Sequence, residues 1–193
     1  MTDYFIKKLT ALFAEGLDED DRAIVEYGIT ATVLNLPKTI FVILVGKKIG
    51  LLKPVLLMFL FISFIRNYSR GIHARTPFAC FAVGTGIYLG AAYMSKVLTI
   101  PKRIYNAIFA YCFLVYAKYS PSGTEVNPVY RDQIKPLKIR SLLCITIYYV
   151  IGTFTAGVVR NIAALSAVVQ TISILPITYK LAGQKGGVVH EEE

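Results

Sequence analysis

Six long apolar stretches, separated by short basic ones, determine what this 193-residue chain can fold into. They cover residues 23–46, 50–65, 77–95, 104–117, 141–158 and 161–179. A helix needs about 20 mostly apolar residues to cross a bilayer, and a chain that is 55% hydrophobic has more apolar surface than one soluble core of this size can bury. The pattern predicts an all-α fold, a polytopic membrane helix bundle of about six transmembrane helices. The last two stretches are expected to form a tight hairpin with Arg160 and Asn161 at its tip.

Residues 1–22 predict an amphipathic N-terminal helix and not a secretory signal peptide, because no continuous apolar stretch precedes a small-residue cleavage site. Apolar residues recur there at helical spacing: Phe5, Ile6, Leu9, Leu12 and Phe13. This spacing is typical of a helix that lies in the membrane interface. A short helix that covers the bundle from the cytosol is an equally good interpretation.

The basic residues favour an N-terminus on the cytoplasmic side of a bacterial cell membrane, because that orientation places most of the 21 Lys and Arg residues inside. We expect one integral membrane domain over residues 1–193, with a cytoplasmic loop at 118–140. Since the stretches near 47–53 and 96–103 are also basic, a four-span bundle with partly re-entrant segments stays open. The basic residues are dispersed between apolar runs, which argues against a nucleic-acid partner despite the net charge of +9.

One polar stretch stands apart: residues 66–80 read RNYSRGIHARTPFAC. Other chemistries for a membrane enzyme lack the residues they need. The chain has two histidines and no HExxH, so no metal is expected. Its aspartates all lie outside the predicted spans, and neither GxSxG nor a phosphate-binding GxxxxGK[ST] loop occurs. His73 and Cys80 remain as a candidate base and nucleophile, and no cofactor is expected.

His73 and Cys80 can meet only if the chain between them is not helical, because seven residues of helix would separate them by about 10.5 Å along the axis. Thr is a good N-cap and Pro is favoured at the first helical position. Thr76 and Pro77 therefore predict a helix that begins at Pro77, with Cys80 one turn in. Residues 66–76 would then form a catalytic loop that folds His73 back over this turn.

The start of a helix also favours a reactive thiol. The helix dipole stabilises an anion there by about 0.3 to 1 kcal/mol, and Arg66, Arg70 and Arg75 would add to this, whereas burial would oppose it. Arg66 would alternatively orient the loop or neutralise an oxyanion. Cys112 and Cys144 lie in apolar runs without basic neighbours, and we interpret them as small buried hydrophobic residues.

The spacing Arg66-x4-Gly71-x-His73-x6-Cys80, at the edge of a predicted span, resembles the accessory gene regulator B (AgrB) family. A second stretch agrees, since YSPSGTEVNPV at 119–129 is similar to that family's proline-bearing segment ahead of a basic run, here KPLKIR. The resemblance covers nearly the full chain in length and hydropathy. Gly71 is expected to give the loop its backbone freedom.

The chain departs from the family pattern where a single Gly71 stands in place of a glycine pair, and where Ser122-Gly123 replaces alanine and aspartate. The resemblance implies a cysteine endopeptidase of peptide quorum sensing, with Cys80 as nucleophile and His73 as general base and then acid. Such an enzyme would remove the acidic C-terminal tail of a precursor peptide through a thioester on Cys80. An internal Cys or Ser of the precursor would then resolve the thioester to a cyclic thiolactone or lactone. The resemblance also implies a homodimer.

The charges indicate how the precursor would be held. Two basic groups on the expected cytoplasmic face would steer an acidic tail towards the thiol: Arg66, Arg70 and Arg75, and Arg131, Lys135, Lys138 and Arg140. The positive-inside rule explains the second group equally well. Ser69, Ser122 and Thr124 are candidates for orienting His73.

Two other classes of protein stay open. A small transporter or peptide exporter would use Glu26, Asn35 and Lys38, near a kink at Pro37, as a polar site within the membrane. A purely structural membrane subunit would leave Cys80 no more reactive towards an alkylating probe than the other two cysteines.

Overall fold

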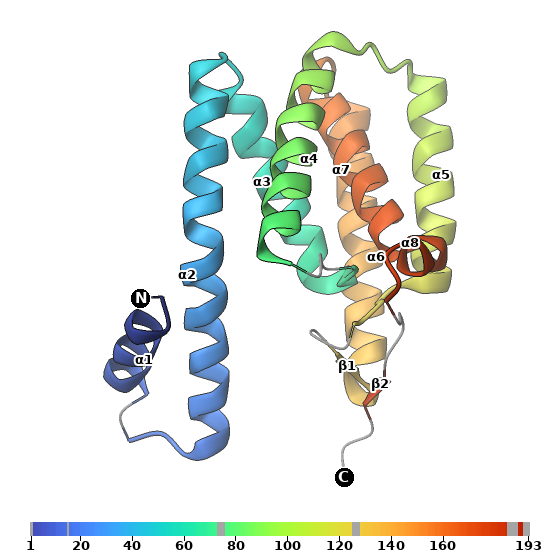
Figure 1. Ribbon diagram of the computed structural model, residues 1–193. Coiled ribbons are helices and arrows are strands. Elements are labelled where there is room, and N and C mark those ends of the chain that lie inside the picture. The colour runs from blue at the N-terminus through green and yellow to red at the C-terminus, as the bar shows by residue number, and fades with distance from the viewer. Residues whose placement is uncertain (1, 15, 73–75, 125–127, 185–188, 191–193) are drawn as a thin grey trace. The chain divides into compact units, whose positions relative to one another are not determined.

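The structure, a computed structural model, describes residues 2–14, 16–72, 76–124, 128–184 and 189–190. Over these residues the chain forms eight helices and two strands of two residues each, so the predicted all-α fold is confirmed (Figure 1). The chain divides into two compact units, Met1–Val45 and Gly46–Glu193, and each is described by itself. The single domain over residues 1–193 stays a prediction.

The first unit contains helix α1 (Thr2–Phe13) and most of helix α2 (Glu19–Lys48). The amphipathic helix expected over residues 1–22 is therefore shorter than predicted, because α1 ends at Phe13 and α2 begins at Glu19. Gly16 has a φ of 82°, which is a conformation that ends helices. Asp18 Oδ1 accepts a hydrogen bond from Asp21 N at 2.8 Å and caps the start of α2.

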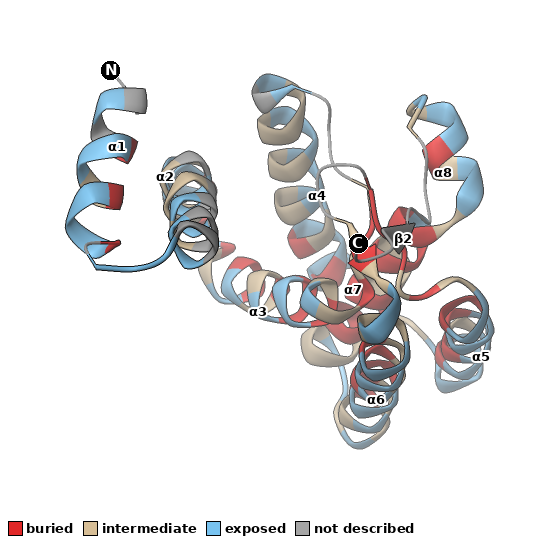
Figure 2. Cartoon of the chain, turned by 90° about the horizontal axis from the view of Figure 1, so that it is seen from below, coloured by how far each residue is buried: buried red, intermediate tan, exposed pale blue. Residues whose placement is uncertain are grey.

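One face of α1 is buried and another is exposed. Ile6, Thr10 and Ala14, spaced four residues apart, are at most 8% exposed, whereas Leu12 and Phe13 are 67% and 66% exposed (Figure 2). The apolar residues of this helix therefore do not share one buried face. The exposed ones fit a helix that lies in the membrane interface.

The second unit contains the end of α2 and six further helices: α3 (Leu52–Ser69), α4 (Pro77–Val97), α5 (Lys102–Tyr119), α6 (Arg131–Phe154), α7 (Val158–Ile174) and α8 (Pro176–Leu181). In the described part of the chain, four segments are long and apolar enough to cross a membrane: Gly28–Lys48, Leu52–Ser69, Phe78–Val97 and Arg131–Phe154. Helix α5 and the shorter apolar α7 fall outside this set. All six predicted runs are largely helical, as expected of a multi-pass membrane protein. Four of them are long and apolar enough to cross a membrane, so six full spans stay a prediction.

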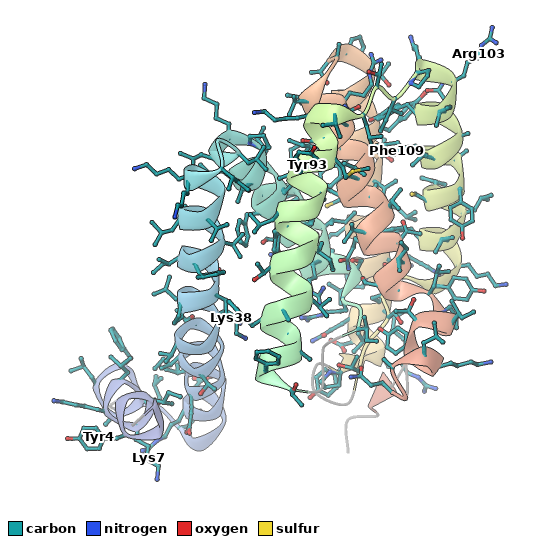
Figure 3. The ribbon with its side chains drawn as sticks, turned by 45° about the horizontal axis from the view of Figure 1, so that its top comes forward. Tyr4, Lys7, Lys38, Tyr93, Arg103 and Phe109 are labelled. Atoms are coloured by element: carbon teal, nitrogen blue, oxygen red, sulfur yellow. The ribbon has the colours of Figure 1, made fainter. Side chains whose placement is uncertain are left out.

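Helix α7 lies at the centre of the second unit, in contact with α3, α4, α5 and α6. Its buried residues Ala163, Ala164 and Ala167 are small and let the neighbouring backbones approach closely. Phe109 of α5 points into the bundle and is 3% exposed, whereas Arg103 of the same helix points away from it (Figure 3). The buried residues of the unit therefore gather around α7.

The connection between α6 and α7 differs from the prediction. The turn lies at residues 155–157, where Gly157 has a φ of 60°, and Arg160 and Asn161 lie inside α7 and not at the tip. Both side chains bind carbonyls that helix ends leave free. Arg160 Nε donates to a carbonyl in the last turn of α6 at 2.8 Å, and Asn161 Nδ2 donates to Leu98 O, at the end of α4, at 2.7 Å.

The loop expected at residues 118–140 is shorter than predicted, because α5 ends at Tyr119 and α6 begins at Arg131. Its C-terminal part is helical because Lys, Arg and Leu favour helix. The connection that remains ends in strand β1 (Val129–Tyr130), which pairs in parallel with strand β2 (Val189–His190).

Candidate active site

The start of α4 determines the position of Cys80. Thr76 Oγ1 accepts a hydrogen bond from Ala79 N at 3.1 Å, and Pro77 occupies the first helical position, so the predicted helix start is confirmed. Cys80 N donates to Thr76 O at 2.9 Å, which places Cys80 in the first turn. The thiol is therefore attached where a helix has free N–H groups and a partial positive charge.

Cys80 differs from the other two cysteines in exposure. It is partly exposed, whereas Cys112 and Cys144 are 0% and 3% exposed, and all three are free thiols. The prediction that Cys112 and Cys144 are small buried residues is confirmed. Cys80 alone of the three retains substantial accessible surface.

The predicted partner of Cys80, His73, lies outside the described residues, as does Arg75. The distance between the imidazole and the Cys80 sulfur therefore stays a prediction. The structure does describe the chain up to Ile72, the residue directly before His73. This segment is held by hydrogen bonds from three other parts of the second unit.

Arg70 and Gly71 turn the chain sharply at the end of α3, with φ values of 57° and 123°. The second value is one that only glycine adopts readily, which agrees with the backbone freedom expected of Gly71. Gly71 N donates to Ser122 O at 2.8 Å, and Ser122 N donates to Ser69 O at 3.0 Å. The two polar stretches that resemble the AgrB pattern therefore lie side by side.

Helix α7 holds the same loop from another side. Gln170 is 0% exposed, and its Nε2 donates to Ser69 Oγ at 2.8 Å and to Arg70 O at 2.5 Å. Ile72 N donates to Ser173 O at 3.0 Å. Residues 66–69, expected within the catalytic loop, belong to α3, so the loop begins at Arg70. Its backbone is fixed to α7 at Arg70 and at Ile72, the last described residue before His73.

Arg66, in the last turn of α3, binds the loop a third time. Its Nη2 donates to Ile72 O at 2.5 Å, the carbonyl directly before His73. A hydrogen bond from a charged donor is stronger than one between neutral groups. Of the roles expected for Arg66, this contact supports orientation of the loop.

The short helix α8 covers the second polar stretch. Tyr179 is 3% exposed, and its hydroxyl donates to Ser122 O at 2.9 Å. Burial raises the pKa of the Tyr179 phenol above its ordinary value of 10.0, although the contact with Ser122 and the positive charge of Arg66 act in the opposite direction. The phenol is therefore a neutral donor at physiological pH.

The second basic group lies in the first turns of α6. Lys135 and Arg140 are exposed, and Lys138 is half-buried. One residue beyond this group, Ser141 Oγ lies 2.7 Å from Ser120 Oγ. This hydrogen bond connects the basic end of α6 to the stretch that packs on the catalytic loop.

Gln170, Ser173 and Tyr179 are residues of this site that the sequence did not point out. A signal was present, because an amide inside an apolar run must find a partner within the protein. Its partner Ser69 lies 101 positions earlier, and one sequence gives no information on that pairing. Ser69 and Ser122 were candidates for orienting His73. In the structure Ser69 Oγ donates to Ile65 O and accepts from Gln170 Nε2, and the described bonds of Ser122 are made by its backbone.

The profile of Accessory gene regulator B proteins matches residues 1–174. The chain belongs to the accessory gene regulator B family. A protein described as AgrB-like from Clostridium acetobutylicum is 28% identical, over 82% of this chain and 77% of that protein. Protein FsrB of Enterococcus faecalis is 23% identical over 81% and 65% of the two chains. Accessory gene regulator protein B of Staphylococcus intermedius is 22% identical over 79% and 81%.

No solved structure matches this AgrB-family chain. The profile match confirms the predicted resemblance. Family membership supports a role in autoinducer peptide processing within quorum-sensing gene regulation. The matched region ends at residue 174, which leaves α8 and its Tyr179 outside it.

Proposed function

We propose that this AgrB-family protein is a membrane-embedded cysteine endopeptidase that removes the C-terminal tail of a quorum-sensing precursor peptide and promotes cyclisation of the remainder. Cys80 is the nucleophile and His73 is its base. The proposal is supported above all by the partly exposed Cys80 in the first turn of α4, seven residues after His73 in the sequence.

The reaction begins when His73 takes the proton of the Cys80 thiol and the thiolate attacks the carbonyl carbon at the cleavage site. As the tetrahedral intermediate collapses, the C–N bond breaks and His73 gives the proton to the amine of the departing tail. The remaining peptide is then a thioester of Cys80. An internal Cys or Ser of the precursor attacks the same carbonyl carbon, forms the thiolactone or lactone, and releases the Cys80 thiol.

Converting an amide into a thioester is unfavourable, so removal of the tail or of the cyclic product must drive the reaction forward. Water must also be kept from the thioester, because hydrolysis would give a linear peptide. A site at the membrane edge limits the access of water. The precursor's own nucleophile competes well because it is held close to the carbonyl.

Tail release by the purified protein in lipid, given its matching precursor, tests the proposal. We expect Cys80→Ala and His73→Ala each to abolish release of the C-terminal fragment. Cys112→Ala and Cys144→Ala are matched controls and should still release it. Normal cleavage by Cys80→Ala and His73→Ala would rule out the peptidase, and a protein that moves the precursor without cutting it would be the alternative transporter.

We also place the N-terminus and the site on the cytoplasmic side, where the basic end of α6 would bind the acidic tail. Reversing the charges of Lys135, Lys138 and Arg140 should raise KM strongly, since long-range attraction mainly affects encounter. Reversing Lys102 and Arg103, at the start of α5, is the control and should leave KM unchanged. Equal KM values in all three proteins would contradict electrostatic steering. A homodimer stays a prediction.

A further inference from the structure

Gln170 is a buried amide that the reaction described above does not use. It lies in α7, the central helix of the second unit, and is 0% exposed. A polar side chain inside a membrane bundle is costly and generally has a specific partner or task. Both described bonds of its amide nitrogen go to the end of α3, to Ser69 Oγ at 2.8 Å and Arg70 O at 2.5 Å.

The backbone that Gln170 holds leads directly to His73. A Cβ on Gly71 would lie 3.2 Å from Gln170 Nε2 and 2.6 Å from Ser173 Oγ, so the loop packs on α7 with no space left between them. Ile72 N then donates to Ser173 O at 3.0 Å. Close contact with α7 thus continues to the residue before His73.

The acceptor end of the same amide is unpaired. Gln170 Oε1 is buried and has no hydrogen-bond partner among the described residues. A buried polar atom without a partner destabilises a fold, and an apolar side chain of the same shape would avoid this loss. Stability alone therefore does not explain a glutamine at this position, whereas its two donated bonds to the loop do.

We propose that Gln170 is a positioning residue for the catalytic pair. By binding Ser69 Oγ and Arg70 O, it sets the direction in which the loop leaves α3 and so the position of His73 relative to Cys80. Gln170 touches no reacting atom in this role. The inference rests on the proposed function, because the position of His73 matters to catalysis only if His73 acts as the base.

Hydrogen–deuterium exchange in lipid nanodiscs tests whether Gln170 holds the loop. Gln170→Leu removes both donors and should make the peptide covering residues 66–76 exchange faster. Thr171→Val is the matched control, because Thr171 is 1% exposed and its hydroxyl donates within α7, to Ala167 O at 2.7 Å. Equal exchange in Gln170→Leu and the wild type would overturn the proposal. Gln170→Met, with its more adaptable side chain, gives the same test if the Leu variant does not fold.

Kinetics test whether the loop position matters for the reaction. We expect kcat for tail release to fall about 10- to 100-fold in Gln170→Leu, as for a small displacement of a catalytic group. KM should change little, and Thr171→Val should retain the kcat of the wild type. The pH profile of Cys80 alkylation in Gln170→Leu should also approach that of His73→Ala, because a displaced imidazole no longer activates the thiol.

The two experiments separate the possible failures. Faster exchange of the loop with unchanged kcat and an unchanged alkylation profile would overturn the positioning role and leave the proposed function intact. If Cys80→Ala releases the tail normally, the proposed function is wrong and the positioning role falls with it. The exchange measurement would still report directly on the bond between Gln170 and the loop.

Discussion

Replacing Gly71 by alanine tests the close packing of the catalytic loop on α7. Gly71 has a φ of 123°, and holding a residue with a side chain in such a sparsely populated region costs about 1 to 3 kcal/mol. The new Cβ would also lie 2.6 Å from Ser173 Oγ and 3.2 Å from Ser173 O, so either the loop or α7 must shift. The strain alone lowers the ratio of native to displaced loop by about 5- to 150-fold.

Tail release at saturating precursor measures this loss, together with thermal unfolding in nanodiscs. We expect kcat of Gly71→Ala to fall about 10- to 100-fold, because the clash and the strain together displace the segment that leads into His73. Gly90→Ala is the control: its Cβ would meet nothing within 4 Å, and alanine favours a helix by about 0.5 to 1 kcal/mol over glycine. This variant should keep its activity and should be at least as stable as the wild type.

A second substitution separates the clash from the strain. Ser173→Ala removes the oxygen nearest to the added Cβ, so in the Gly71→Ala background it should restore part of kcat. The backbone strain at Gly71 remains and should prevent full recovery. If the single variant Gly71→Ala has the same thermal unfolding temperature and the same kcat for tail release as the wild type, the reasoning from φ and from the contact with α7 is refuted.

Three further predictions concern helix ends and α8. Thr76→Ala removes the N-cap of α4 and should lower the free energy of unfolding by about 1 kcal/mol in chemical denaturation. Asn161→Leu leaves carbonyls at the end of α4 without their donor and should lower the same quantity by about 1 to 3 kcal/mol, with kcat unchanged. Tyr179→Phe should lower the free energy of unfolding by about 1 kcal/mol at neutral pH. Because the folded pKa of Tyr179 lies above its unfolded value near 10.0, this stabilisation is complete below that pH and is lost as pH rises through the folded pKa. A difference between Tyr179→Phe and wild type that persists at strongly alkaline pH would contradict this.

Features of the fold that depend on neighbours in sequence could be predicted. The apolar runs predict the helices because a membrane requires each segment to pair its own backbone groups. Thr76 and Pro77 predict the start of α4 because a cap acts on the residues directly after it. Arg160 and Asn161 misled the prediction, since their polarity suggested a turn while their side chains bind carbonyls at the ends of other helices.

The candidate site was predictable in part for the same reason. The spacing of Arg66, Gly71, His73 and Cys80 is visible in a single stretch of sequence and carries the family resemblance. The bond from Gln170 to Ser69 joins residues 101 positions apart. In the hydrophobic pattern Gln170 is only a polar residue that interrupts an apolar helix. Only the packing of α7 against α3 reveals that this residue belongs with the catalytic loop.

The hydrogen bonds that hold the catalytic loop can form only late in synthesis of the chain. Arg66 is made before the loop, but Ser122 follows about fifty residues later and Gln170 and Ser173 about fifty after that, at roughly 5–20 residues per second on a ribosome. For several seconds the nascent chain therefore carries Cys80 without the contacts that fix the loop. We expect the proposed peptidase activity to be the last property that the protein acquires, which would protect nearby membrane proteins from cleavage by an incomplete chain.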